Sequence, residues 1–228
     1  MKDIQHLFFD LDHTLWDFEK NSALTFQEIL QKHKIPVLLP DFLAVYSPIN
    51  FAYWKRFREE NVTKEALKYG RLKDTFTTLK IAVADDVIHQ LADDYLAHLP
   101  NHNCLFDGTF EILEYLQTNY KLHIITNGFE EVQSLKLEKS GLKKYFNHVI
   151  TSETVGVKKP NPKIFEFALK TTGATVANSI MIGDNLEADI QGAISFGLEV
   201  IHCNFDNTLG IDKNIVSVAS LLEIKQYI

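Results

Sequence analysis

The sequence is poor in cysteine, in long apolar runs and in positive charge, and each shortage excludes a class of protein. Its two cysteines, Cys104 and Cys203, form neither a CxxC pair nor a metal-ligand spacing. The net charge of −7 argues against non-specific binding to a nucleic acid polymer, although small anionic substrates stay possible. No apolar run approaches the roughly 18 residues of a membrane span, and the first residues do not resemble a signal peptide. We therefore expect a cytoplasmic protein with reduced thiols and no membrane partner.

Residues 17–99 have the periodicity of amphipathic helices and no strand-like alternation. The clearest helix follows Asp85, where apolar residues recur every three or four positions behind acids that suit the helix dipole. We expect Asn21 or Ser22 to cap the first helix, Pro48 to interrupt the second and Thr63 to cap a later one. These residues therefore predict an all-helical unit.

After Pro100 the pattern changes, because short apolar runs now alternate with helical segments. Alternation of this kind is typical of βαβ units, in which a parallel sheet is covered by helices on both faces. A further run at residues 7–9 precedes the helical stretch, so the helices interrupt one doubly wound α/β core. The later apolar runs lie at residues 122–125, 149–150, 179–182 and 199–202.

Candidate functional residues lie at the ends of three of these runs. Asp10 and Asp12 come after the first run, Thr126 ends the second and Asp184 follows the fourth. Parallel strands place their carboxyl ends at one edge of a sheet, where open α/β folds bind ligands. Carboxylates gathered there repel one another unless a cation lies between them, and Mg²⁺ is the simplest oxygen-binding candidate.

Four segments carry a resemblance to a known family. The sequence DLDHT at residues 10–14 resembles the D-x-D-x-T opening of the haloacid dehalogenase superfamily, in its phosphatase branch. The resemblance covers essentially the whole chain. It implies a Rossmann-like doubly wound core over residues 1–16 and 100–228, with an all-helical cap inserted at 17–99. The other motifs resembled are TNG at 126–128, KPNP at 159–162 and GDNLEAD at 183–189.

The resemblance implies that Asp10 is a nucleophile that forms an aspartyl-phosphate. Asp12 would protonate the leaving group and then activate water, and its backbone carbonyl would bind Mg²⁺. Thr126 and the backbone N–H of Asn127 would bind the phosphoryl group. Thr14 is expected to shape the turn through hydrogen bonds to the backbone.

The remaining motif residues would balance charge. The lysine of the third motif corresponds to Lys159, which would neutralise Asp10 and the phosphoryl oxygens. The neighbouring Lys158 is the alternative. Asp184 would ligate Mg²⁺ together with Asp10, and Asp189 would support the site by holding Lys159 or a metal-bound water.

The substrate prediction is less specific. The LWDF sequence at 15–18, the aromatic stretch at 50–57 and Arg71 most resemble pyrimidine 5′-nucleotidases, which act on nucleoside monophosphates. Phe18, Trp54 and Arg71 are the candidate substrate contacts. The alternative is that Phe51, Trp54 and Phe57 form the core of the helical unit. The alternatives are a phosphatase of phosphoglycolate or small sugar phosphates, a sugar-phosphate mutase and, remotely, a non-catalytic binding domain. The presence of Asp12 argues against a true haloacid dehalogenase.

Overall fold

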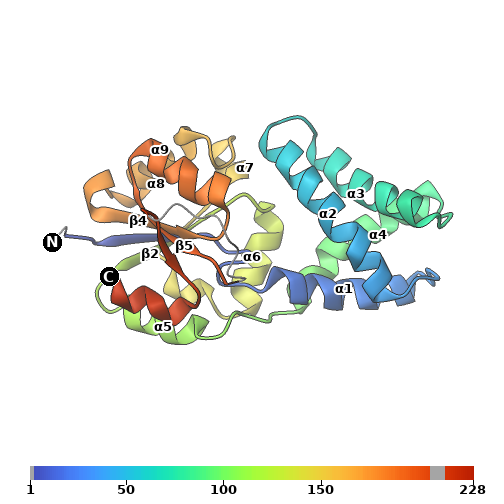
Figure 1. Cartoon of the computed structure of the whole chain (residues 1–228), viewed down its shortest axis with the longest axis horizontal. Helices are drawn as coiled ribbons and strands as arrows, with labels where there is room; N and C mark the ends of the chain where they lie inside the picture. The colour runs from blue at the N-terminus through green and yellow to red at the C-terminus, as the bar shows by residue number, and fades with distance from the viewer. Residues whose placement is uncertain (1–2, 206–213) are drawn as a thin grey trace. The chain divides into compact units, whose positions relative to one another are not determined.

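The computed structural model describes residues 3–205 and 214–228 and divides the chain into two compact units (Figure 1). The α/β unit comprises Met1–Phe18 and Asn103–Ile228, and the helical unit comprises Glu19–His102. The chain leaves and re-enters the α/β unit along paired segments, because the Asp17 N–H donates to the Cys104 carbonyl at 3.1 Å. The α/β unit therefore ends at residue 18 and resumes at residue 103, whereas the boundaries expected from sequence were 16 and 100.

The α/β unit is built on a six-stranded, fully parallel sheet in the order β3-β2-β1-β4-β5-β6. The central strand β1 is buried along its whole length, as its apolar sequence predicts. Strand β6 was not predicted from sequence, because a stretch of three residues that are not all apolar is too short to show a strand pattern. The strands are β1 (His6–Phe9), β2 (Lys121–Thr126), β3 (His148–Thr151), β4 (Ser179–Gly183), β5 (Glu199–Cys203) and β6 (Val216–Val218).

Helices cover both faces of this sheet, which confirms the predicted α/β class. Helices α5 and η5 lie on one side of the strands, and α8 and α9 lie on the other (Figure 1). On the α8 side, Phe8, Ile125 and Met181 pack with Phe165 in a fully buried cluster. The helical segments of this unit are α5 (Thr109–Leu116), α6 (Glu130–Lys139), η2 (Lys143–Tyr145), α7 (Ser152–Val155), α8 (Pro162–Thr172), η3 (Val176–Asn178), the π-helical η4 (Leu186–Gln191), α9 (Gly192–Phe196) and η5 (Leu221–Gln226).

The helical unit contains most of α1 (Phe18–Lys32), then α2 (Leu39–Arg58), α3 (Lys64–Leu79), α4 (Asp85–His98) and the short η1 (Leu99–Asn101). Thr63 caps α3 by accepting from the Ala66 N–H at 3.1 Å, as predicted. The expected cap at Asn21 or Ser22 is wrong, because α1 already begins at Phe18 and both side chains are buried.

The expected interruption at Pro48 is also wrong, because α2 continues through it. Proline removes one backbone hydrogen bond, but the buried side chains of Tyr46 and Asn50 on either side anchor the helix. Within residues 3–205 and 214–228, no helix combines the length and apolar character that crossing a bilayer needs. Both cysteines are free.

Candidate active site

The predicted site residues of the α/β unit gather at the carboxyl edge of its three central strands. Asp10 follows β1, and its N–H donates to the Ile182 carbonyl of β4 at 2.9 Å. Thr126 is the last residue of β2, and Asp184 follows β4. Because β1 lies between β2 and β4, these side chains reach one crevice although they are far apart in sequence.

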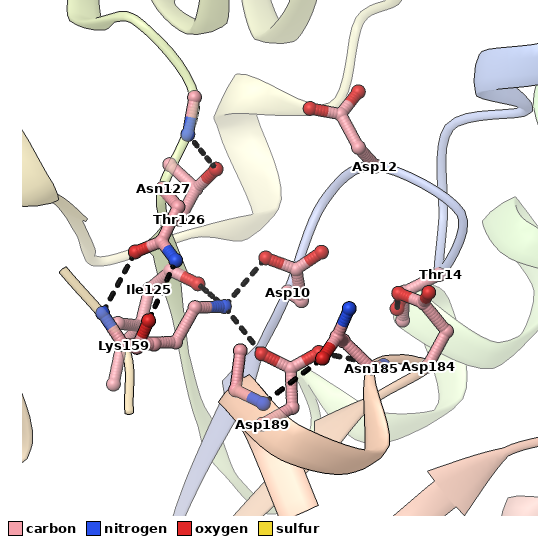
Figure 2. Close-up of polar contacts among 12 residues, drawn as sticks. Asp10, Asp12, Thr14, Ile125, Thr126, Asn127, Lys159, Asp184, Asn185 and Asp189 are labelled. Carbon is pink, nitrogen blue, oxygen red and sulfur yellow. Dashed lines mark hydrogen bonds and ion pairs between the residues drawn. The ribbon is translucent and has the colours of Figure 1, made fainter. Parts of the chain in front are cut away.

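The ammonium of Lys159 lies between Asp10, the Ile125 carbonyl and Asp189 (Figure 2). It contacts Asp10 Oδ1 and the Ile125 carbonyl, both at 2.6 Å, and Asp189 Oδ1 at 2.7 Å. Burial alone would lower the pKa of Lys159, but the two carboxylates outweigh it and raise that pKa above its usual value. Lys159 is therefore a fixed positive charge beside Asp10, whereas Lys158 is only half-buried.

The side chain of Asn127 holds the main chain of Lys159. Its amide donates to the Lys159 carbonyl at 2.9 Å, and its oxygen accepts from the Lys159 N–H at 2.8 Å. Sequence reasoning gave Asn127 only a backbone contact with the phosphoryl group. The structure adds this second task, since two hydrogen bonds fix the point from which Lys159 extends.

Three carboxylates share the crevice. Oxygen atoms of Asp10, Asp184 and Asp189 all lie within 4.8 Å of one another. Asp189 comes this close because residue 183 is glycine: a Cβ there would lie 2.4 Å from Asp189 Oδ2. Thr14 donates to Asp184 Oδ1 at 3.1 Å, so its hydroxyl serves the acid cluster. The sequence had led us to expect a hydrogen bond to the backbone of the turn instead.

The electrostatics of this cluster fit a bound divalent cation. Burial, followed by repulsion from Asp189, raises the pKa of Asp184 to about 8. Burial also raises the pKa of Asp10 well above its usual range, although Lys159 opposes the shift. Clustered carboxylate oxygens are the ligands that Mg²⁺ prefers, and an ion among them relieves this repulsion. The predicted ligands were Asp10, Asp12 and Asp184, with Asp189 in support; the structure places Asp189 in the same cluster.

The carboxylate of Asp12 is turned away from that of Asp10 (Figure 2). Its Oδ1 contacts the ammonium of Lys136 at 2.6 Å, and its Oδ2 accepts from the Gln133 amide at 2.9 Å. Gln133 also donates to the Thr126 hydroxyl oxygen at 2.8 Å. Sequence reasoning missed Gln133 and Lys136. The available signal was two long polar side chains, three residues apart on the helix that follows Thr126.

The candidate substrate contacts belong to two different units. Phe18 belongs to the α/β unit and packs against the ring of Trp16, with centroids 6.2 Å apart. Trp54 belongs to the helical unit, where it is half-buried and packs edge-on against Phe57. Arg71 is buried within the core of the helical unit.

Arg71 is 2% exposed and donates to Asn50 Oδ1 at 2.8 Å. Its guanidinium lies over the ring of Tyr95, 5.0 Å from the centroid. In this structure Arg71 therefore contributes to packing and hydrogen bonding inside the helical unit, and a contact with substrate stays a prediction.

Fold and site together define a Rossmann-like α/β protein with an acidic, cation-binding crevice at the carboxyl edge of its sheet. A model of the family described as haloacid dehalogenase-like hydrolase matches residues 7–203. The chain therefore belongs to this hydrolase family, which confirms the resemblance described above.

Similar proteins include a pyrimidine 5′-nucleotidase, YjjG of Escherichia coli (strain K12). The two sequences are 31% identical over 87% of this chain and 85% of that protein. The crystal structure of the putative HAD-hydrolase YfnB of Bacillus subtilis, bound to magnesium, superposes with a TM-score of 0.91 at 29% identity, over 99% of both chains. A glyceraldehyde 3-phosphate phosphatase of Methanothermobacter thermautotrophicus (strain ATCC 29096 / DSM 1053 / JCM 10044 / NBRC 100330 / Delta H) is 27% identical over 98% of this chain and 97% of that protein.

Proposed function

We propose that this protein is a magnesium-dependent phosphomonoesterase that acts on nucleoside 5′-monophosphates through an aspartyl-phosphate. The observation that carries the proposal is the buried contact of 2.6 Å between Lys159 and Asp10, within a cluster of acids. A carboxylate held between a fixed ammonium and a cation site is arranged to approach a phosphate ester, because both positive charges offset its repulsion from the phosphoryl oxygens.

The predicted magnesium cofactor is confirmed by the family, by the acid cluster and by the magnesium-bound relative YfnB. Asp10 and Asp184 would hold the ion, together with the backbone carbonyl of Asp12, and Asp189 would support it. When bound, the ion supplies positive charge beside the phosphoryl oxygens.

The residues then divide the chemistry into two displacements. Asp10 forms a bond to phosphorus as the bond to the leaving oxygen breaks, and Asp12 gives that oxygen a proton. Asp12 next takes a proton from the water that attacks phosphorus, which releases phosphate and restores Asp10. The Thr126 oxygen already accepts from the Gly128 N–H and from Gln133, so its own proton can be donated to the phosphoryl group.

The choice of a nucleotide substrate is supported by the pyrimidine 5′-nucleotidase among the relatives. Contacts of Phe18, Trp54 and Arg71 with the substrate are part of the proposal. A phosphatase of small sugar phosphates is the second candidate, since the glyceraldehyde 3-phosphate phosphatase matches almost all of this chain. We propose that the substrate partner of the site is a small phosphorylated metabolite. We also propose that the protein acts in the cytoplasm.

A substrate panel tests this proposal. We expect phosphate release with Mg²⁺ from dUMP, dTMP and UMP to exceed release from glyceraldehyde 3-phosphate and phosphoglycolate by roughly tenfold or more in kcat/KM. Asp10→Asn and EDTA should each abolish release, and Asp41→Asn, the same change at an exposed helical site, should leave it unchanged. Preference for glyceraldehyde 3-phosphate would overturn the nucleotide assignment. Activity that persists in Asp10→Asn would overturn the mechanism.

A further inference from the structure

Two side chains of α6 each contact a different oxygen of the Asp12 carboxylate. The ammonium of Lys136 contacts Oδ1 at 2.6 Å, and the amide of Gln133 donates to Oδ2 at 2.9 Å. Both donor residues are almost fully buried, whereas the side chain of Asp12 keeps 21% of its surface exposed. The carboxylate is therefore held from the protein side and open on the other.

Lys136 is not a solvated surface lysine. Its ammonium lies 4.1 Å from the centroid of the Trp16 ring and 5.3 Å from that of the Phe18 ring. Taking an ammonium out of water is unfavourable unless a partner compensates for the lost hydration. Among the described contacts of Lys136, the ion pair with Asp12 supplies that compensation. The buried position of Lys136 therefore depends on Asp12.

Gln133 connects Asp12 to Thr126, the residue proposed to bind phosphate. The same amide nitrogen that donates to Asp12 also donates to the Thr126 hydroxyl oxygen at 2.8 Å. Gly128 makes room for it, because a Cβ at residue 128 would lie 2.5 Å from the Gln133 side-chain carbon Cδ. Gln133 therefore links the Asp12 carboxylate directly to Thr126, the residue proposed to bind the phosphoryl group.

We propose that Lys136 and Gln133 are positioning residues that aim the Asp12 carboxylate for proton exchange with the leaving oxygen. The inference rests on the proposed function, in which Asp12 is the general acid and base. A carboxylate has about four lone-pair positions, and the two donors take one on each oxygen. The open positions then face the exposed side, where the proton is given to the leaving oxygen and later taken from water.

The dependence on the leaving group separates positioning from structural support. A poor leaving group needs its proton as the bond to phosphorus breaks, whereas p-nitrophenolate leaves without one. Phenyl phosphate and p-nitrophenyl phosphate have nearly the same shape and differ mainly in this need. The ratio of their kcat/KM values does not depend on the fraction of correctly folded enzyme, because that fraction multiplies both values equally.

Lys136→Met should lower kcat/KM for phenyl phosphate by roughly 10- to 100-fold and for p-nitrophenyl phosphate by less than about threefold. Gln133→Leu should change the ratio in the same direction by a smaller factor, since a neutral donor is weaker than a charged one. Lys170→Met, the same substitution on the exposed surface of α8, should leave both values unchanged. Lys136→Arg keeps the charge and should recover part of the loss for phenyl phosphate.

A double-mutant cycle tests whether Lys136 acts through Asp12. In an Asp12→Asn background, Lys136→Met should add less than about a twofold further change, because the group it aims is already gone. Equal losses for both phosphates, an increase in activity, or a full additional loss in the Asp12→Asn background would overturn the inference. Failure of the proposed function would look different, since Asp10→Asn would then retain activity towards both substrates.

Discussion

Thr14 illustrates how single residues outside the acid cluster shape it. Its hydroxyl donates to Asp184 Oδ1 at 3.1 Å and so fixes one oxygen of a proposed metal ligand. The carbonyl of Asp184 is held in turn by His202 Nε2 at 2.9 Å. Hydrogen bonds of this kind orient a ligand before the ion arrives, and they raise metal affinity without touching the ion.

We therefore expect Thr14→Val to weaken the apparent Mg²⁺ affinity by roughly tenfold, with kcat largely restored at saturating Mg²⁺. The measurement is phosphate release as a function of Mg²⁺ concentration. Thr77→Val, the same change at an exposed position of α3, is the matched control. An unchanged Mg²⁺ dependence in Thr14→Val would show that this hydrogen bond does not orient Asp184 for the ion.

At the scale of elements, two histidines join β1 and β2 away from the acid cluster. His6 Nδ1 lies 3.0 Å from His123 Nε2, a distance at which one ring donates to the other and only a neutral ring can accept. Burial, followed by repulsion from His6, His148 and Lys121, lowers the pKa of His123 to about 3. Burial likewise lowers the pKa of His6.

The free energy of unfolding should consequently decrease as the pH is lowered. The unfolded chain takes up protons on histidine near pH 6.5, whereas the folded pair resists them, so the stabilisation is complete above that pH. The contribution of His123 is lost as the pH falls from about 6.5 towards 3, at up to roughly 1.4 kcal/mol per pH unit. Urea unfolding between pH 7.5 and 4.5 should show a shallower loss in His123→Phe than in the parent or in exposed His89→Phe. Parallel curves for the parent and His123→Phe would contradict this assignment.

The elements differ in how far sequence could predict them. Strand β1 was predictable because a wholly apolar run that ends in acids has one favourable place in an α/β fold. Helix α6 was predictable as a helix, but its task was not. Periodicity assigns apolar residues to the buried face, and it gives no reason to bury Gln133 and Lys136. Their partners Asp12 and Thr126 lie in other elements, so only the fold brings the pairs together.

At the scale of the whole molecule, chemistry and substrate choice are separable problems. Every motif residue predicted from sequence belongs to the α/β unit. There, a residue that follows a strand of the parallel sheet lies at the carboxyl edge of that sheet, so its place in the fold can be predicted from its place in the sequence. The helical unit offers no comparable rule. Its aromatic residues include the rings of Phe26, Phe42 and Tyr95, which pack into a core of their own. Composition alone could not separate such core residues from substrate contacts, and Arg71 proved to be buried among them.

The most direct test of the account is to trap the aspartyl-phosphate. Asp12→Asn treated with ³²P-labelled p-nitrophenyl phosphate should accumulate it, because this leaving group needs no acid while the attacking water still needs a base. After an acid quench, we expect the label on the peptide that contains Asp10, and none in Asp10→Asn. Turnover without label at Asp10, together with activity in Asp10→Asn, would contradict the central claim that Asp10 is the nucleophile.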